Sequence, residues 1–407
     1  MSARRIVIVG AGPAGVGAAL AARQQDAAAD VLLVSDEPCE PYEKPPLSKA
    51  VLTGKAKPAD APIAGPRGVG GQGIALKIGT RCTAINRVAR NVTTEAGEHI
   101  HYDALVLATG SLNRTLPLFP PGRPRIHYLR SHDEALALRE ELGRARTVLV
   151  VGAGLIGLEV AASARAIGIA VTVVEIAPRI LARVCDEETA ALIQAYHTKH
   201  GVDIRLGAAI TAVQNLPDGI AVETKAGEPV TADLVVVGAG VGPDDRLAKA
   251  AGLAVQDGII IDARCVTSDP SILAAGDCTR FPGPHGPVRL ENWRHAQEQG
   301  AVAGRNAAGG ETTYNVAPSF WSEQYDLYIQ GAGWPLPHGS TKVRRAIGPN
   351  ALLRFELDGH RLAYVFGINA QRDIAAARRL IERRVPIDPA ELADPSKPLA
   401  AMLRAKT

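Results

Sequence analysis

The stretch that decides the fold is Arg5–Gly15, RIVIVGAGPAG, and a close copy, VLVVGAGLIG, occurs at Val148–Gly157. Each copy is a short β-rich run that ends in the spacing G-x-G-x-x-G and leads into an alanine-rich helical stretch. A second pair of similar segments follows the two copies: Asp103–Gly110 (DALVLATG) resembles Asp233–Gly240 (DLVVVGAG). Continuous apolar strands alternating with helices predict an α/β protein with two tandem units, each a parallel sheet covered on both faces.

The glycines of each copy suit a phosphate-binding turn. In the first copy, Gly10 permits the tight turn, Gly12 lets the backbone approach a pyrophosphate, and Gly15 lets the helix pack closely on the strand. An acid about 20 residues on binds ribose hydroxyls in such units, and Asp36 fits that position. The second unit has an equivalent set: Gly152, Gly154, Gly157 and Glu175. Two complete fingerprints predict two dinucleotide sites, with ligand-free glycine turns as the alternative.

Glu175 also bears on the choice of nucleotide in the second unit. A carboxylate at this position accepts hydrogen bonds from both ribose hydroxyls of NAD and repels a 2′-phosphate, so the sequence favours NADH over NADPH. Arg179 and Arg183 follow within a few residues and would partly offset that repulsion.

Length and composition exclude several classes of protein. At roughly 150 residues per domain, the 407 residues suffice for two or three domains. The chain has no run of 18 uncharged apolar residues, which argues against a membrane-spanning helix. MSARR leads directly into the apolar run Ile6–Val9 with no room for a secretory signal, so we expect a cytoplasmic protein. Five scattered cysteines without a C-x-x-C pair argue against a disulfide framework, disulfide chemistry and structural zinc.

Charge and histidine spacing point to a protein partner rather than to nucleic acid or metal. The net charge is +3, and residues 319–407 hold 13 Lys and Arg against 9 Asp and Glu. So small an excess, without a basic motif, argues against nucleic-acid binding and suits a negatively charged protein partner. His197 and His200 stand at i, i+3 without a third ligand, so we expect no metal site and place both on a solvated helix face.

Several motifs resemble the FAD-dependent ferredoxin and rubredoxin reductases, a group that includes apoptosis-inducing factor. They are the two fingerprints, ATG at Ala108–Gly110, AGD at Ala275–Asp277 and, above all, PYEKPPLSK at Pro41–Lys49. Glu291–Gln297 (ENWRHAQ) and Phe320–Asp326 (FWSEQYD) match as well. The resemblance implies that the first unit binds FAD, that the second unit is inserted into it and binds NADH, and that a C-terminal domain docks an electron carrier.

The resemblance, together with a change in composition from Ser319 onward, predicts a division into domains. Residues 1–112 and 241–318 form the two parts of an FAD-binding domain, residues 113–240 an NAD-binding domain, and residues 319–407 an α+β domain. In the last we expect strands at Ala351–Leu357 and Leu362–Ile368 and helices at Ile374–Arg384 and Pro389–Ala393. The loop Gly54–Gly73 has no clear period and is expected to be mobile.

The resemblance also assigns residues to the reaction. It implies that Lys49 lies near the flavin N5 and pairs with Glu159, that Asp277 accepts a hydrogen bond from the ribityl chain, and that a helix from about Trp293 to Asn306 points its positive end at the flavin pyrimidine. Trp293 and Trp321 are candidates for the flavin edge that faces the carrier, with core packing as the alternative. Further cofactor contacts are expected from Ala14, Lys44, Cys82, Ala108, Thr109, Gly110, Arg130, Arg183 and Gly240. At Lys44 the family usually has arginine.

The implied reaction is hydride transfer from NADH to FAD, followed by single-electron transfer to an iron-sulfur ferredoxin or a rubredoxin that feeds an oxygenase. The protein would act as a monomer or homodimer. One alternative is an NADH oxidase or peroxidase, for which Cys39 is the only candidate cysteine; another is a redox-sensing binding flavoprotein. The arginines Arg378, Arg379, Arg383 and Arg384 either dock an acidic carrier or form an ordinary charged helix surface.

Overall fold

The first fingerprint lies at the centre of a parallel sheet. The computed structural model describes residues 3–225, 227–336 and 339–404. The strands of this sheet are β1 (Arg5–Val9), β2 (Asp30–Val34), β3 (Ala75–Lys77), β7 (Ala104–Leu107) and β19 (Ile272–Ala274). Their order is β19-β7-β1-β2-β3, and every neighbouring pair is parallel. The chain therefore reverses its direction of winding between β1 and β7, where open α/β sheets bind ligands at the carboxyl ends of their strands.

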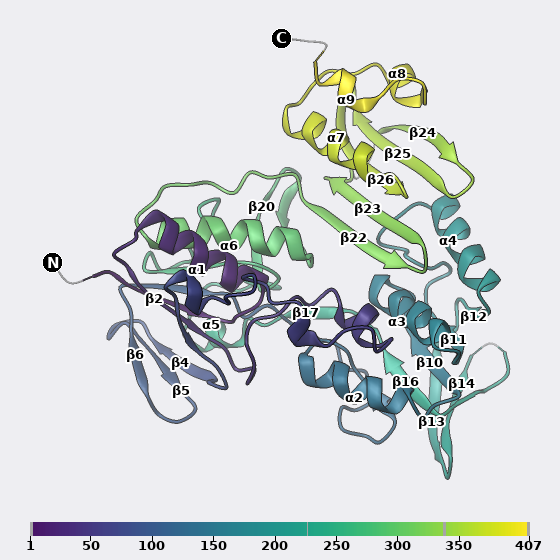
Figure 1. The fold of residues 1–407 in the computed structure, drawn as a ribbon, viewed down its shortest axis with the longest axis horizontal. Helices are drawn as coiled ribbons and strands as arrows, with labels where there is room; N and C mark the ends of the chain where they lie inside the picture. The colour runs from purple at the N-terminus through teal and green to yellow at the C-terminus, as the bar shows by residue number, and fades with distance from the viewer. Residues whose placement is uncertain (1–2, 226, 337–338, 405–407) are drawn as a thin grey trace.

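Two helices, α1 (Pro13–Gln25) and α6 (Trp293–Ala307), lie side by side in this unit although they are far apart in sequence (Figure 1). Small residues let their backbones approach, since a Cβ at Gly300 or Gly304 would lie 2.1 or 2.0 Å from the carbonyl oxygens of Ala14 and Ala18. The same core includes residues of a small antiparallel sheet that the sequence did not predict. Its strands are β4 (Cys82–Asn86), β5 (Asn91–Thr94) and β6 (His99–His101).

The second fingerprint forms an equivalent unit. Its strands are β9 (Ile126–His127), β10 (Thr147–Val151), β11 (Ala170–Val174), β12 (Val202–Arg205) and β16 (Leu234–Val237), in the order β12-β11-β10-β16-β9, all parallel. Helices α2 (His132–Leu142), α3 (Leu155–Ala166) and α4 (Glu187–Lys199) belong to it. A further antiparallel sheet consists of β13 (Ile210–Leu216), β14 (Gly219–Thr224) and β15 (Val230–Ala232). The prediction of two parallel sheets is confirmed.

The second unit is inserted in the first. The chain passes into it through β8 (Ser111–Asn113) and returns through β17 (Val241–Pro243), and these strands pair with each other. After the return come α5 (Arg246–Ala250), β18 (Ile259–Ile260), β20 (Thr279–Gly283) and β21 (Gly286–Val288). Because β19 then pairs with β7, the first sheet is completed only after the whole insertion.

The C-terminal part is an antiparallel sheet with helices packed on it, as Figure 1 shows. The strands are β22 (Ser319–Gln324), β23 (Leu327–Gly333), β24 (Thr341–Gly348), β25 (Ala351–Asp358) and β26 (Arg361–Ile368). The helices are α7 (Gln371–Glu382), α8 (Pro389–Ala393) and α9 (Leu399–Met402). The α+β class is confirmed, while the limits at residues 112, 240 and 318 as boundaries of independent domains stay predictions.

The loop Gly54–Gly73 contains more regular structure than its sequence indicated. Short 3₁₀ turns form at Pro58–Asp60 and Gly70–Gln72, and the Val69 side chain is fully buried against the first unit. Its mobility stays a prediction. Among the helices of the described residues, none is long and apolar enough to cross a membrane.

Candidate functional site

The first glycine turn has the shape that a bound pyrophosphate requires. Gly10 has a φ of +105°, and a Cβ there would lie 2.2 Å from the Ala108 carbonyl oxygen. A Cβ at Gly15 would lie 1.8 Å from the Gly10 oxygen, so only glycine fits at both positions. At Gly12, in contrast, the nearest atom to an added Cβ is Lys44 Cε at 4.0 Å. The space beside Gly12 is open, and no side chain caps the N-terminus of α1 that faces the turn.

The second glycine turn repeats this geometry. Gly152 has a φ of +104°, and its Cβ would lie 2.5 Å from the Gly238 oxygen, while a Cβ at Gly157 would lie 2.1 Å from the Gly152 oxygen. An added Cβ at Gly154 would meet no atom within 4 Å, and no side chain caps α3. Both turns therefore fit the pyrophosphate of a dinucleotide, with free backbone N–H groups at a helix N-terminus.

Glu175 lies directly after β11, beside the second turn. Its Oε2 accepts a hydrogen bond from the Ala153 N–H at 2.7 Å, and its Oε1 accepts one from the Ala177 N–H at 2.8 Å. These bonds fix the carboxylate between the glycine turn and the loop after β11. The remaining lone pairs of the two oxygens can accept ribose hydroxyls.

The two arginines near Glu175 have different surroundings. Arg179 donates to the carbonyl oxygens of Cys185 at 2.6 Å and Ala182 at 2.8 Å, so its guanidinium holds the local backbone. Arg183 is exposed, and its Nη2 would lie 3.6 Å from a Cβ at Gly240. Of the two, Arg183 is the one positioned to meet a nucleotide phosphate.

Asp36 is not the positional equivalent of Glu175. The registers Val9↔Val34 and Val151↔Val174 make Ser35 the counterpart of Glu175, which places Asp36 one residue farther along. The Asp36 side chain is 59% exposed, with an Oδ2–Nη2 distance of 3.8 Å to Arg81. It lies close enough to Cys82 that its charge, together with burial as the main cause, raises the pKa of that thiol to about 11. Asp36 and Cys82 are thus brought together, and their role in binding stays a prediction.

Lys44 lies over the first glycine turn. Its Nζ donates to Glu37 Oε1 at 2.9 Å and to the Tyr42 hydroxyl at 3.1 Å. Burial lowers the pKa of Lys44, and the positive charge of Arg130 acts in the same direction, while Glu37 opposes the shift. The acid and the phenol therefore hold a single cationic point charge beside Gly12, without the fork that arginine would offer.

A second polar cluster lies at the carboxyl ends of β7 and β19. Asp277 Oδ2 accepts a hydrogen bond from Ser111 Oγ at 2.8 Å and lies 3.4 Å from Arg130 Nη2. Burial raises the pKa of Asp277, and Arg130 and Ser111 oppose that rise. Arg130 Nη2 would lie 3.4 Å from a Cβ at Gly110. The structure therefore brings three of the predicted contacts, Gly110, Arg130 and Asp277, together where the winding of the sheet reverses.

Two other predicted contacts have defined neighbours. Ala14, in the first turn of α1, lies against Gly276, where an added Cβ would be 2.8 Å from the Ala14 Cβ. Thr109 Oγ1 donates to the Asp244 carbonyl oxygen at 2.6 Å and so ties the end of β7 to the chain after the insertion. Both residues border the first glycine turn or its neighbouring strand end.

Lys49 and Glu159 form a buried ion pair between the two units. Lys49 lies in the single wide π-helical turn Leu47–Val51, and its Nζ is 2.8 Å from Glu159 Oε2. Ser48 Oγ donates to the same Oε2, and Ser322 Oγ donates to Oε1 at 2.7 Å. Glu159 is only 2% exposed, so its charge is balanced by these donors rather than by water.

The polar chain continues into the C-terminal sheet and α4, which the sequence did not reveal. Gln324 Nε2 donates to Ser322 Oγ at 3.1 Å, and His197 Nε2 bonds Gln324 Oε1 at 2.9 Å. His197 is fully buried, so its assignment to a solvated helix face is wrong, whereas His200 is half-buried. Burial lowers the pKa of His197 to about 4. A signal was present in the sequence, since Ser322 and Gln324 are two residues apart and share one face of a strand with Phe320.

Trp293 and Trp321 meet where the first unit and the C-terminal sheet adjoin. Trp293 begins α6 and Trp321 lies in β22, and their ring centroids are 5.8 Å apart in an edge-to-face arrangement. Both side chains are half-buried, so neither is a core residue. Burial raises the pKa of Glu43, and a hydrogen bond from the Trp293 side chain opposes that rise. The pair can shield an aromatic group while keeping it near the surface.

The basic helix α7 divides into inner and outer arginines. Arg378 lies 2.8 Å from Glu298 of α6 and 3.1 Å from Glu382, so it joins the C-terminal sheet to the first unit. Arg379, Arg383 and Arg384 are exposed. Of the four arginines named from the sequence, these three are exposed to a partner, and Arg372 of α7 is exposed as well.

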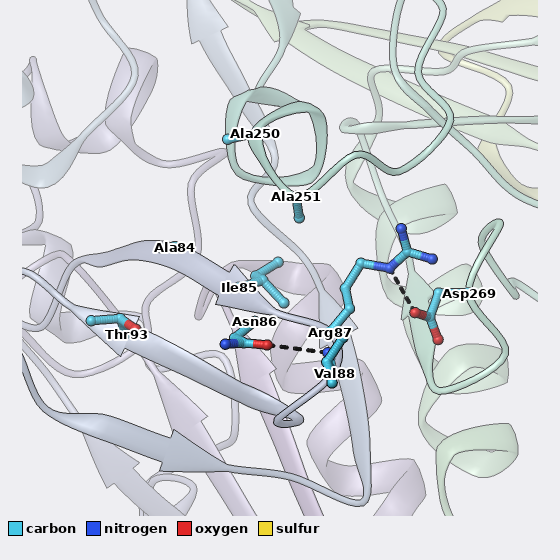
Figure 2. Close-up of a pocket in the computed structure, with 9 residues that line it drawn as sticks. All are labelled: Ala84, Ile85, Asn86, Arg87, Val88, Thr93, Ala250, Ala251 and Asp269. Carbon is cyan, nitrogen blue, oxygen red and sulfur yellow. Dashed lines mark hydrogen bonds and ion pairs between the residues drawn. The ribbon is translucent and has the colours of Figure 1, made fainter.

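Other features of the described chain offer no competing site. All five cysteines are free thiols, and residues 3–225, 227–336 and 339–404 contain no group of three or more His, Cys, Asp or Glu able to hold a metal. An open groove of about 740 Å³ is lined by residues of β4, β5 and the end of α5. Figure 2 shows these lining residues. The charged residues of the groove, Arg87 and Asp269, pair with each other at 2.7 Å, and its lining contains none of the predicted dinucleotide contacts.

Comparison with known proteins agrees with this geometry. Residues 4–300 match the model of the pyridine nucleotide-disulphide oxidoreductase family, and residues 319–403 match that of the reductase C-terminal domain. The chain is 41% identical to the ferredoxin--NAD(+) reductase component of the anthranilate 1,2-dioxygenase system of Burkholderia cepacia, covering 99% of this chain and 100% of that protein. It is 38% identical to rhodocoxin reductase of Rhodococcus erythropolis, covering 96% and 92%. The reductase in the covalent putidaredoxin reductase–putidaredoxin complex superposes with a TM-score of 0.92 at 35% identity, covering 100% and 99%.

Proposed function

The chain belongs to the pyridine nucleotide-disulphide oxidoreductase family, and from that premise we propose that it is an FAD-dependent NADH:ferredoxin reductase of an oxygenase system. NADH is the two-electron hydride donor, and an iron-sulfur ferredoxin or a rubredoxin is the one-electron acceptor. Bound FAD supplies the conversion of a two-electron hydride donor into single-electron steps. The observation that carries the proposal is the Lys49–Glu159 ion pair, which joins two units that each contain an open glycine turn.

We assign the first unit to FAD. Its pyrophosphate would lie beside Gly12, on the backbone N–H groups at the start of α1, with the Lys44 ammonium above it. Asp277 is held by Ser111 and Arg130 at the end of β19, so its carboxylate is oriented to accept a ribityl hydroxyl. The N-terminus of α6 would place positive potential at the flavin pyrimidine.

We assign the second unit to NADH. The nucleotide pyrophosphate would lie beside Gly154, and the fixed carboxylate of Glu175 would accept both ribose hydroxyls. A 2′-phosphate would meet that carboxylate, while Arg179 is occupied by backbone carbonyls and only Arg183 is free to compensate. This arrangement favours NADH over NADPH.

Lys49 and Glu159 then act where the two sites meet. The Lys49 ammonium would put positive charge beside bound flavin and would there stabilise the negative charge of a hydride acceptor. Glu159 holds that ammonium in place through the 2.8 Å contact between Lys49 Nζ and Glu159 Oε2. Since Glu159 is 2% exposed, water does not weaken the interaction.

The carrier would approach the side that contains the tryptophan pair. Trp293 and Trp321 pack edge to face and are both half-buried, so they would shield bound flavin while keeping it close to a docked carrier. Arg379, Arg383 and Arg384 would attract an acidic carrier to the neighbouring surface. We also propose a cytoplasmic location, where the five free thiols stay reduced.

The test separates the two half-reactions. The purified protein should be yellow, with one non-covalent FAD per chain, and NADH should bleach it under anaerobic conditions. A reduced sample should then reduce an iron-sulfur ferredoxin or a rubredoxin, with ferricyanide as a small acceptor that needs no docking surface. A colourless protein that FAD cannot reconstitute refutes the proposal, as does bleaching without reduction of any carrier tested.

The alternatives make different predictions in the same assay. An NADH oxidase or peroxidase would consume NADH with oxygen or peroxide alone, and its cysteine would need thiolate character. Burial raises the pKa of Cys39, with the negative charges of Glu37 and Asp133 adding to the rise, so its thiol is not activated. A redox-sensing flavoprotein would bleach slowly and turn over negligibly with ferredoxin.

A further inference from the structure

The Glu159 carboxylate is the end of a buried chain of hydrogen bonds that starts on α4. His197 bonds Gln324 at 2.9 Å, Gln324 donates to Ser322 at 3.1 Å, and Ser322 donates to Glu159 at 2.7 Å. His197, Gln324 and Ser322 are fully buried, and Glu159 is 2% exposed. No link can be replaced by water without opening the interior, so each donor restricts the next group.

The carboxylate at the end of this hydrogen-bond chain fixes which group donates in each hydrogen bond. A carboxylate only accepts, so the Ser322 hydroxyl must donate to Glu159 and accept from the amide nitrogen of Gln324. The Gln324 oxygen is thereby turned to His197, which must donate from Nε2. Among the described residues, His197 Nδ1 is buried and has no partner, which suits a neutral ring that carries its proton on Nε2. A single arrangement of protons satisfies every link.

The hydrogen-bond chain joins α4, β22 and α3, which are distant in sequence. Ser322 and Gln324 point to one face of β22, whereas Trp321 points to the other, where it meets Trp293. One strand thus lies between the tryptophan pair and the Lys49–Glu159 pair. Ser322 occupies Oε1 of the carboxylate, and Lys49 and Ser48 occupy Oε2, so rotation of the carboxylate would break a charge-assisted bond on either side.

We infer that His197, Gln324 and Ser322 are positioning residues for the NADH half-reaction, which hold Glu159 so that it keeps the Lys49 ammonium at the reacting edge. The inference rests on the proposed function and deepens it. None of the three residues needs to touch either cofactor. The alternative is that the chain merely ties the C-terminal sheet to the second unit, and the two roles predict different kinetics.

The test measures anaerobic bleaching by NADH over a range of NADH concentrations, which separates the limiting rate from the apparent Kd. Ser322→Ala removes the donor to Glu159, and His197→Leu removes the start of the chain. His197→Gln retains an N–H donor and serves as the rescue. Tyr196→Phe is the matched control, because the Tyr196 hydroxyl bonds Asp326 and links the same helix to the same C-terminal segment outside the chain.

We expect Ser322→Ala to lower the limiting rate about tenfold, the effect of losing one charge-assisted hydrogen bond in the transition state. His197→Leu should lower it less, His197→Gln should restore it, and the apparent Kd for NADH should stay within about twofold, because the nucleotide contacts are untouched. Tyr196→Phe should match the wild type. In a Lys49→Ala background, Ser322→Ala should have little further effect, since both act through one pair.

Three results would overturn the inference while leaving the proposed function intact. They are a wild-type limiting rate in Ser322→Ala, an equal loss of rate in Tyr196→Phe, and additive effects of Ser322→Ala and Lys49→Ala. If NADH fails to bleach the wild-type protein itself, the proposed function fails and the inference fails with it. Should His197→Leu not fold, Ser322→Ala and the control still decide the matter.

Discussion

Mild acid should destabilise the protein through two buried histidines. Burial lowers the pKa of His197 to about 4 and that of His295 to about 3. The groups facing His197 are His200 on its own helix, the Tyr325 ring at 5.1 Å and the neutral Gln324 amide; His200 adds to the lowering and Gln324 opposes it. In the unfolded chain an ordinary histidine titrates near 6.5.

The sign and size of this change in stability follow from the difference between the folded and unfolded pKa values of each histidine. A histidine whose folded pKa lies below its unfolded pKa binds more protons when unfolded, so its stabilising contribution is complete above about pH 6.5 and is lost as the pH falls toward about 4. Between pH 7 and pH 5, a shift of this size removes about 2 kcal/mol of stability for His197 and about 2 kcal/mol for His295. Each loss is a considerable part of the stability of a typical domain.

The assay is urea unfolding at pH 7 and pH 5, followed by far-ultraviolet circular dichroism. His197→Gln cannot titrate, so it should lose about 2 kcal/mol less than the wild type over this interval. His285→Gln is the control, because His285 is exposed and its replacement should leave the pH dependence unchanged. If the wild type and His197→Gln lose stability in parallel, His197 is not held neutral in the folded protein, and the direction assigned to the hydrogen-bond chain is wrong.

Three further predictions concern the cofactor, nucleotide and carrier sites. Gly12→Val should push a side chain into the open space beside the first turn and yield a colourless protein, measured by FAD content after purification; full retention of FAD would contradict the assignment. NADH should bleach the flavin much faster than NADPH, and Glu175→Ala should reduce the difference between the two rates. The same change should destabilise the second unit, because two backbone N–H groups lose their acceptor. Equal stopped-flow rates with NADH and NADPH in the wild type would refute the preference for NADH. Trp321→Ala, or charge reversal at Arg379 and Arg383, should slow ferredoxin reduction and leave the rate of flavin bleaching by NADH nearly unchanged. The slowing caused by charge reversal at the arginines should become smaller as the salt concentration rises past about 0.15 M, where the screening length is about 8 Å. An equal loss in both half-reactions would make the C-terminal sheet a structural support.

Features that depend on near neighbours in sequence could be predicted without coordinates. Gly10 and Gly15 lie within a few residues of the strand and helix that they join, and their backbone demands are visible in the spacing alone. The same holds for Gly152 and Gly157 in the second unit. Apolar strands that alternate with helices then fix two parallel sheets, because a strand buried on both faces must be apolar throughout.

Some assignments from sequence were displaced by one residue or one contact. Asp36 was paired with Glu175 by spacing, yet the strand registers make Ser35 the counterpart. The strands β2 and β11 are equally long, but the segment from Gly15 to the start of β2 is longer than the segment from Gly157 to the start of β11, so a count from the glycines does not locate the end of the strand. Arg378 shared a helix surface with Arg379 in sequence, yet it turns inward to Glu298. Helical periodicity says which residues share a face and not what lies against it.

The sequence by itself indicated two α/β units with glycine turns, and its resemblance to a known family implied that one unit is inserted in the other. Only the tertiary structure revealed the hydrogen bonds that reach Glu159 from Ser322, Gln324 and His197, because Ser322 lies 163 residues from Glu159 and His197 lies 127 residues from Gln324. Such contacts leave no periodic trace in a single sequence, and a histidine in a polar helix reads as solvated until another strand covers it. Burial by distant elements, and not residue type, made His197 neutral and aligned the donors toward one carboxylate.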